Sequence, residues 1–256
     1  MDNGEVLQVT VAGGVATLTL DSPADRNALS RAMRSQLRSA LTAALADDAV
    51  RVIVLDHTGR VFCSGMDMRE AAGGDAESQG VREFPELLEL LWSSPTPVLS
   101  DVRGPARAGG VGLLAACDVV VAGAASTFAF SEVRLGLVPA VISAVVLPRM
   151  ARPVAHRLML TGEVFGADVA VASGLVDLVV PDDEVDATVA AQVAALVAGA
   201  PSALAETKRL LRSGRERLDF DALLEISARR FAGEEGQEGM AAFREKRPAR
   251  WVPPAT

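Results

Sequence analysis

The chain has 256 residues, of which 33 are acidic and 25 are basic, so its formal net charge is −8. Hydrophobic residues make up 50% of the sequence, more than a disordered chain carries, and the length fits one large domain or a main domain with an appendage. The acidic balance argues against general binding to nucleic acid or to anionic membranes, both of which need a basic footprint.

The first half of the chain alternates strands and helices. Val6–Val11 and Val15–Leu20 are β-rich runs joined by Ala-Gly-Gly, which is typical of a hairpin. Ser30 is placed to cap a helix that continues to about Ala46. We then expect a strand at 51–56, a loop at 57–65, a mobile loop at 71–80, a helix at 81–92, a strand at 98–102, a helix at 109–116 and a strand at 118–122. This alternation predicts a parallel sheet built from βαβ units.

The second half is almost wholly helical in pattern. Helices are expected at 141–150, 153–160, 166–172, 183–199, 202–213 and 219–247, with one strand at 175–180. We therefore divide the chain into an α/β core, residues 1–200, and a helical C-terminal region, residues 201–256.

No segment is typical of export or membrane insertion. The longest uncharged run, Ala187–Ala205, is rich in alanine and interrupted by Pro201, whereas a spanning helix needs about 20 strongly apolar residues. The N-terminus, MDNGEV, lacks the regions of a signal peptide. The two cysteines, Cys63 and Cys117, have no metal-binding spacing. We expect a soluble, reduced, cytoplasmic protein with no metal site and no nucleic-acid or membrane partner.

A glycine-rich segment covers residues 104–115. Residues 110–115 satisfy G-x-G-x-x-A, and Glu132 lies about 20 residues further on, as in a dinucleotide-binding fingerprint. That fingerprint should follow the first strand of its unit, whereas here three earlier strands precede the one that leads into it. Two alternatives remain: small residues that allow close helix–sheet packing, or backbone N–H groups near Gly109 that open a helix and face an anion.

The loop at 61–69 supplies a second set of backbone donors just beyond a buried strand, where α/β proteins place their sites. Ser64 could act as a nucleophile, but no G-x-S-x-G motif surrounds it. His57 and His156 are expected to be ordinary surface or core histidines, and Cys63 a small buried hydrophobic residue.

Glu132 is the one acidic residue between Asp118 and Glu163, and its neighbours in sequence are phenylalanine and aliphatic residues. Loss of hydration would raise its pKa and suit it to proton transfer. The alternative is a surface charge or an ion pair with Arg134. The chain contains no tyrosine, so a phenol cannot take part.

Four segments, in order, resemble the crotonase, or enoyl-CoA hydratase/isomerase, superfamily. They are Val15–Ser30, Val61–Glu70, Gly104–Gly123 and Phe128–Pro139, and Leu160–Val180 and Gly239–Trp251 resemble its later helices and C-terminus. The match covers essentially the whole chain. It implies an α/β fold, a crotonase-like spiral of ββα units with a helical C-terminal trimerisation region, assembled as a homotrimer or a dimer of trimers.

The resemblance implies an acyl-CoA thioester whose carbonyl oxygen lies between two backbone N–H groups while an enolate forms. By position these are the N–H groups of Met66 and Gly109, and Glu132 is the general acid/base. Losing one such donor typically costs about 2.7–4 kcal/mol of transition-state stabilisation. No cofactor is implied apart from coenzyme A as part of the substrate.

The chain departs from the family's two-glutamate pattern. Glu132 matches the second glutamate, whereas the first falls on Gly112, and Ala140 replaces a glycine that helps to hold the catalytic water. Asp67 and Asp118 are candidate replacements but are expected to be structural caps. One carboxylate can suffice for isomerisation, and syn hydration by one group is also conceivable.

Coenzyme A is a polyanion, so an acidic chain must bind it through local basic residues. Arg26 and Arg69 match positions at which the family contacts coenzyme A. Residues of the C-terminal helix would approach it from a neighbouring subunit, or else form a solvated basic helix end. The expected substrate and coenzyme A contacts are Arg26, Ala28, Ser64, Asp67, Met68, Arg69, Gly110, Ala140, Phe243 and Lys246.

These observations favour an enzyme that hydrates 2-enoyl-CoA to 3-hydroxyacyl-CoA. The alternatives are a Δ3–Δ2 enoyl-CoA isomerase and a catalytically weak acyl-CoA-binding protein.

Overall fold

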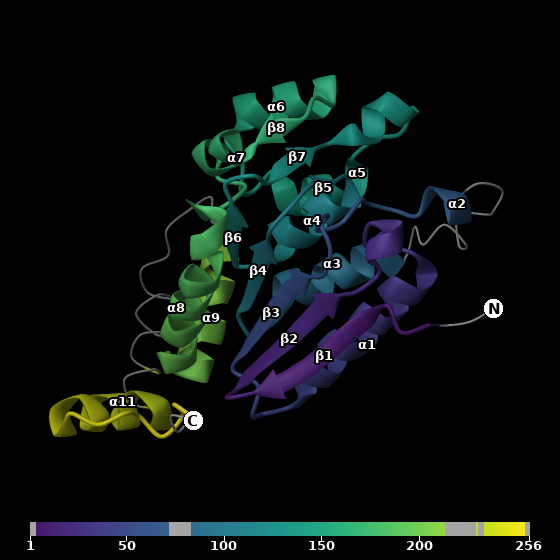
Figure 1. Ribbon diagram of the computed structural model, residues 1–256. Coiled ribbons are helices and arrows are strands. Elements are labelled where there is room, and N and C mark those ends of the chain that lie inside the picture. Colours follow the sequence, from purple (N-terminus) through teal and green to yellow (C-terminus); the bar gives the residue numbers. More distant parts are fainter. Residues whose placement is uncertain (1–3, 72–82, 213–228, 230–232, 254–256) are drawn as a thin grey trace.

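The computed structural model describes residues 4–71, 83–212, 229 and 233–253 (Figure 1). Its frame is a six-stranded sheet and a three-stranded sheet. The larger sheet has the order β1 (Leu7–Ala12), β2 (Val15–Leu20), β3 (Val52–His57), β4 (Val98–Val102), β6 (Val119–Gly123) and β9 (Leu178–Val180). The smaller one has the order β5 (Ala106–Arg107), β7 (Thr127–Ala129) and β8 (Phe165–Gly166).

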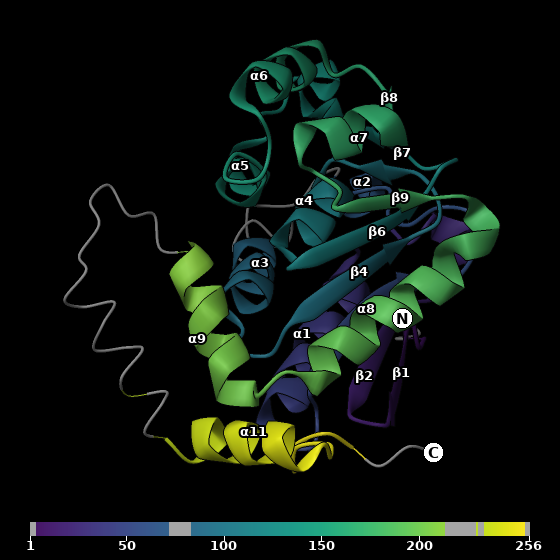
Figure 2. The same cartoon turned by 90° about the vertical axis from the view of Figure 1, so that its left-hand side faces the viewer.

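Helices cover both faces of the larger sheet (Figures 1 and 2). In chain order they are α1 (Arg31–Ala46), α2 (Met68–Ala71), α3 (Glu83–Ser93), α4 (Gly109–Ala116), α5 (Ala140–Val146), α6 (Arg152–Thr161), α7 (Ala167–Ser173), α8 (Val185–Ala198), α9 (Pro201–Arg212) and α11 (Glu234–Glu245). Short 3₁₀ turns lie at Pro23–Asp25, Ser131–Leu135 and Asp182–Glu184. Val185 of α8 packs with valines and leucines of β3, β4 and β6 on one face, while α1, α3 and α4 contribute to the main core on the other.

The α/β organisation expected from the sequence is confirmed. β1 and β2 pair as an antiparallel hairpin, and β2, β3, β4, β6 and β9 pair in parallel. Parallel strands are buried on both faces, which explains why residues 52–55 form a continuous apolar run. The Ser30 hydroxyl accepts the Met33 N–H at 3.2 Å, so the expected cap of α1 is also confirmed.

The smaller sheet has no counterpart among the expected elements. Its strands are two or three residues long, too short for an alternating pattern to be seen. Phe165–Gly166 forms β8, so the predicted start of a helix at 166 is wrong by one residue. The strand expected at 175–180 begins only at Leu178. The expected loop at 71–80 lies almost wholly outside the described residues, as does much of the helix expected at 219–247, of which α11 is the described part.

Helices α8 and α9 meet at a sharp bend. Among the described helices, none is by itself long and apolar enough to cross a membrane, and only Asp182–Ala198 with Pro201–Arg212, bent by 107°, passes such a test as a pair. The bend is tied to the core by Arg51, which donates to the carbonyl oxygen of Gly199 at 2.8 Å and to that of Trp251 at 3.2 Å.

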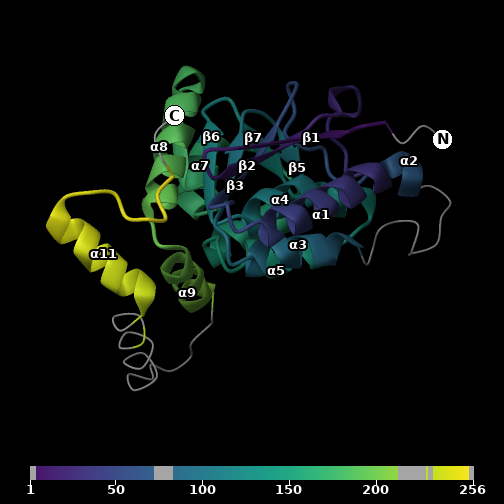
Figure 3. The ribbon, with the colours of Figure 1, turned by 90° about the horizontal axis from the view of Figure 1, so that it is seen from below.

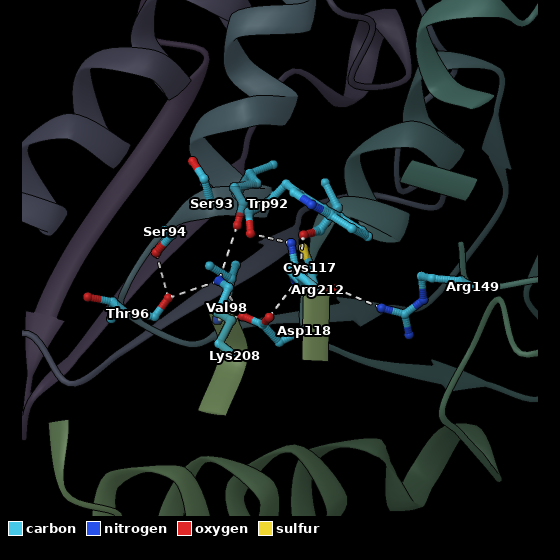
Figure 4. A network of polar contacts seen from close by, with 12 residues as sticks. Trp92, Ser93, Ser94, Thr96, Val98, Cys117, Asp118, Arg149, Lys208 and Arg212 are labelled. Carbon is cyan, nitrogen blue, oxygen red and sulfur yellow. Dashed lines mark hydrogen bonds and ion pairs between the residues drawn. The ribbon is translucent and has the colours of Figure 1, made fainter. Parts of the chain in front are cut away.

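Ion pairs attach α9 to the core (Figure 4). The Asp118 carboxylate lies 2.7 Å from Lys208 Nζ and 2.7 Å from an Arg212 nitrogen, and it accepts the Val98 N–H at 2.8 Å. The Arg212 guanidinium also stacks 3.9 Å from the ring centre of Trp92. Burial lowers the pKa of Lys208, and the charge of Asp118 opposes that effect. Asp118 is therefore a structural residue.

We predict that Asp118→Ala destabilises the protein strongly, because it leaves Lys208 buried without its counter-ion. Breaking a buried ion pair from one side typically costs about 3–5 kcal/mol. Urea unfolding followed by circular dichroism measures this loss. Asp183→Ala, at an exposed position of the Asp182–Glu184 turn, is the matched control and should leave the midpoint unchanged. Equal midpoints for the two variants would contradict the structural role of Asp118.

Candidate active site

Three neighbouring segments of chain run in parallel and lead to the three candidate catalytic groups. Cys63 forms a parallel bridge with Ala106, and Ala106 pairs in parallel with Phe128. Met66 and Gly109 lie three residues beyond the first two positions of this row, and Glu132 lies four residues beyond the third. The pairing of these segments therefore carries Met66, Gly109 and Glu132 to the same end of the row.

Glycines allow the first two segments to touch. A Cβ on Gly110 would lie 2.5 Å from the carbonyl oxygen of Cys63, and a Cβ on Gly65 would lie 3.5 Å from the backbone nitrogen of Gly109. Gly65 also has φ +90°, a conformation that side chains rarely adopt. The G-x-G-x-x-A pattern thus serves a close contact between two backbone segments. This contact, and a position after the fourth strand rather than the first, argue against a dinucleotide fingerprint.

Two backbone donors lie free at this contact. Neither the Met66 N–H nor the Gly109 N–H has a hydrogen-bond partner among the described residues. Gly109 is the first residue of α4, so its N–H belongs to the positive end of the helix dipole. Ala108, before it, has φ 47° and donates its N–H to Ala129 at 2.9 Å. Both free donors can stabilise a developing oxyanion.

Glu132 lies in the 3₁₀ turn Ser131–Leu135. Its Oε2 atom is buried and has no hydrogen-bond partner in the described structure, and no ion pair joins its carboxylate to Arg134 there. Burial raises the pKa of this carboxyl, which is opposed only by a backbone hydrogen bond. The ion pair with Arg134 is thus absent from the described structure, and Glu132 is a half-buried carboxylate whose pKa is raised by burial.

An isoleucine fills the space where a side chain at position 112 would begin. A Cβ on Gly112 would lie 2.5 Å from Ile142 Cγ2 and 3.5 Å from Phe84 Cζ. Ile142, on α5, is 3% exposed, and Phe84, on α3, is 5% exposed. The position of the missing glutamate is therefore occupied by apolar atoms. Ala140 begins α5, two residues before Ile142.

The carboxylates considered as replacements have structural partners. Asp67 Oδ1 accepts the backbone N–H of Arg69 at 2.9 Å at the start of α2, and the Asp67 carboxylate pairs with the Arg69 guanidinium at 2.8 Å. These bonds lower the pKa of Asp67. Asp118 holds α9, as described above. Both were expected to be structural, and the contacts agree.

A cavity of about 310 Å³ lies on the Met66 side of this site. It is lined by Ala24, Asp25, Arg26, Ala28, Ser64, Met66, Asp67 and Arg69. Five predicted coenzyme A contacts are thus brought together beside one predicted oxyanion donor. Arg26 is exposed and has no ionic partner within the described part of the chain, whereas Arg69 pairs with both Asp25 and Asp67.

The other expected contacts lie elsewhere. Met68 begins α2 next to the cavity, and Gly110 is buried against Cys63. Phe243 and Lys246 lie on and just after α11, which is on the opposite side of the molecule from α2 (Figures 1 and 3). Phe243 is 85% exposed. Within a single chain, the structure does not bring α11 to the cavity.

The nucleophilic alternatives have no support in the geometry. Burial raises the pKa of the Cys63 thiol to about 12, so it is not a thiolate at neutral pH. His57 Nε2 accepts the Arg103 N–H at 3.1 Å, so that nitrogen is not available as a base for Ser64. His156 is exposed on α6.

Phe84 and Ile142 are the site residues that the sequence did not single out. Both are apolar residues on the buried faces of their helices, and periodicity alone assigns them to the core. The available signal was Gly112, because a missing side chain in a buried position requires some neighbour to fill its space.

Comparisons with known proteins agree with this geometry. The family model for enoyl-CoA hydratase/isomerase matches residues 10–253. A Rhodobacter capsulatus protein named "Probable enoyl-CoA hydratase" is 37% identical, with 94% of this chain and 96% of that protein covered. The 2,3-dehydroadipyl-CoA hydratase of Escherichia coli is 35% identical, with 91% and 93% covered. The crystal structure of an enoyl-CoA hydratase from Shewanella pealeana superposes with a TM-score of 0.90 at 34% identity, covering 96% of both chains. The crotonase-like fold is confirmed.

We predict that Gly112→Ala destabilises the protein although alanine favours a helix. Alanine normally gains about 1 kcal/mol over glycine in a helix, whereas overpacking a core costs about 1–3 kcal/mol. The new Cβ would meet Ile142 Cγ2 at 2.5 Å, so overpacking should win. In the Ile142→Ala background, the same substitution should instead be neutral or stabilising. A double-mutant cycle in urea measures this coupling, and additive effects would contradict it.

Proposed function

Because the chain belongs to the enoyl-CoA hydratase/isomerase family, we propose that it hydrates 2-enoyl-CoA to 3-hydroxyacyl-CoA through an enolate held in an oxyanion hole. The observation that carries this proposal is the carboxylate of Glu132. Its buried Oε2 atom has no hydrogen-bond partner among the described residues, and its segment runs beside those that carry the two free backbone donors. The names of the relatives support hydration as the reaction.

In the proposed mechanism, the thioester oxygen accepts the N–H groups of Met66 and Gly109. Water adds its oxygen to carbon 3 while the Glu132 carboxylate takes the proton that water loses, and the two N–H groups stabilise the enolate that forms. Glu132 then delivers a proton to carbon 2 on the same face. One carboxylate thus serves as base and acid, and its raised pKa suits both roles.

We propose that coenzyme A binds at the cavity lined by Arg26, Ala28, Ser64 and Arg69. The guanidinium of Arg26 has no carboxylate partner in the described structure, so it can pair with a phosphate. Arg69 would have to share its charge with Asp25 and Asp67. Arg26 should therefore contribute more to binding than Arg69.

One observation favours a second reaction. Ile142 places apolar atoms where a second carboxylate would help to hold water, and isomerisation needs no water. In that case Glu132 would remove a proton from carbon 2 and return one to carbon 4 of the resulting dienolate, turning a 3-enoyl-CoA into a 2-enoyl-CoA. A catalytically weak acyl-CoA-binding protein is the remaining alternative.

We also propose a homotrimer or a dimer of trimers. The distance of α11 from the cavity within one chain supports this assembly, because Phe243 and Lys246 could reach coenzyme A only from another subunit (Figure 3). Light scattering should give three or six times the chain mass of 26.7 kDa, and a monomer would contradict the proposal.

The proposed role of Glu132 predicts that Glu132→Gln lowers kcat by about 10²–10⁴-fold. Wild-type turnover of crotonyl-CoA should rise with pH through a value above 4.5, the ordinary value of a glutamate, since burial raises the pKa of the base. Loss of the conjugated enoyl absorbance, with oxygen-18 uptake from water, reports hydration. Growth of that absorbance from a 3-enoyl-CoA reports isomerisation.

Two controls separate chemistry from folding. Glu184→Gln, at an exposed position, should keep full activity. Glu132→Gln should be at least as stable as the wild type at pH 7, because it removes a buried charge, and this gain should vanish below pH 4.5, where the acid is protonated in both states. Unchanged turnover in Glu132→Gln would refute the mechanism. Binding of acyl-CoA without any turnover would establish the binding-protein alternative.

For the coenzyme A site, we predict that Arg26→Ala raises KM several-fold and weakens its dependence on salt, with kcat little changed, since the phosphates are remote from the reacting carbons. Arg69→Ala should have a smaller effect. Arg152→Ala, which removes an exposed arginine at the start of α6, is the control for total charge. Identical KM values for Arg26→Ala and Arg152→Ala would exclude Arg26 from the site.

A further inference from the structure

The apolar side chains that pack against α4 lie where they can limit the size of a bound acyl group. Phe84 Cζ would lie 3.3 Å from a Cβ on Gly109 and 3.5 Å from a Cβ on Gly112, so one phenyl ring spans the first turn of the helix. The atoms nearest to these two positions all belong to Leu29, Phe84 and Ile142. Apolar side chains of these three residues therefore form a wall against the face of α4 that carries Gly109 and Gly112.

The acyl group must extend toward this wall. Resting on the proposed function, the thioester oxygen lies at the N–H groups of Met66 and Gly109, and the coenzyme A arm occupies the cavity on the Met66 side. The acyl chain and the sulfur arm leave the trigonal carbonyl carbon of a thioester on different sides of the C=O bond. The acyl carbons therefore point away from that cavity, toward Glu132 and the face of α4 that Phe84 and Ile142 cover.

A second space lies on the outer side of the wall. A cleft of about 350 Å³ between α3 and α5 is lined by Pro85, Leu88, Glu89, Trp92, Ala140, Val141, Ala144 and Val145. Phe84 and Ile142 lie on the inward faces of these same two helices, next in sequence to Pro85 and Val141. They separate this cleft from Gly109 and Gly112. The two helices and α4 lie side by side in Figure 2.

We propose that Phe84 and Ile142 are specificity-determining residues that restrict the enzyme to short, uncharged acyl groups. Because Phe84 and Ile142 lie between the reacting carbons and the cleft, a long chain would have to displace them to enter it. These two side chains also offer no cation to a carboxylate at the end of the acyl group, and the atoms nearest to a Cβ at Gly109 or Gly112 are all carbon. Removing either side chain should join the site to the cleft, which then accommodates a longer alkyl chain.

The test compares kcat/KM for crotonyl-CoA and for 2-decenoyl-CoA in the wild type, Ile142→Ala and Phe84→Ala. The wild type should prefer crotonyl-CoA, and each variant should raise the decenoyl-to-crotonyl ratio about tenfold or more, since a few methylene contacts are worth at least that. Leu91→Ala is the matched control. Leu91 is fully buried two turns after Phe84 on α3, so the variant loses core volume without opening the wall.

A second readout keeps this inference separate from the proposed reaction. Calorimetric binding of butanoyl-CoA and decanoyl-CoA should show the same change in preference, whether or not the protein turns over any thioester. If both variants turn over crotonyl-CoA with an unchanged decenoyl-to-crotonyl ratio, the role of Phe84 and Ile142 in specificity is refuted and the proposed function stands. If there is no turnover but the binding preference shifts, the proposed function is refuted and the role of Phe84 and Ile142 stands. An equal shift in Leu91→Ala would also overturn the proposal.

Discussion

The direct contact between the loop around Cys63 and the first turn of α4 is the constraint on which the rest of the site depends. Side chains at Gly65 or Gly110 would separate the two segments by several tenths of an ångström or more. With glycine at both positions, the N–H groups of Met66 and Gly109 become neighbours without using any side chain. Backbone N–H groups fixed in this way need no reorganisation when charge develops beside them, which is what the proposed oxyanion site requires.

The sequence predicted the elements with a strong periodic pattern and the segments that carry backbone donors. α1 could be placed because Ser30 and the apolar spacing agree, and Glu132 stood out as an isolated acid in apolar surroundings. The three-stranded sheet could not be predicted, since two-residue strands such as Ala106–Arg107 have no periodicity. The contact of Ile142 with Gly112 was equally hidden, because it joins residues thirty positions apart through packing alone.

The net charge of the chain does not show which of its cations are free to bind a ligand. The chain carries −8 overall, yet several of its cations have specific partners. Lys208 and Arg212 share Asp118, and the exposed Arg69 pairs with Asp25 and Asp67. In these ion pairs the positive charges are neutralised by carboxylates of the same chain. Arg26 is left as an exposed cation at the cavity without a carboxylate partner in the described residues.

The shared space of Gly112 and Ile142 also constrains how this site could change over evolutionary time. A glutamate that arose at position 112 while isoleucine remained at 142 would be rejected by a steric clash, whatever its chemical benefit. Residue 142 must shrink first, and that intermediate carries a destabilising void until the second change fills it. The order of the two substitutions is therefore fixed. The reverse change, from glutamate to glycine at position 112, passes through an intermediate with the same destabilising void. Such mutual dependence favours keeping glycine at position 112 for as long as Ile142 is present.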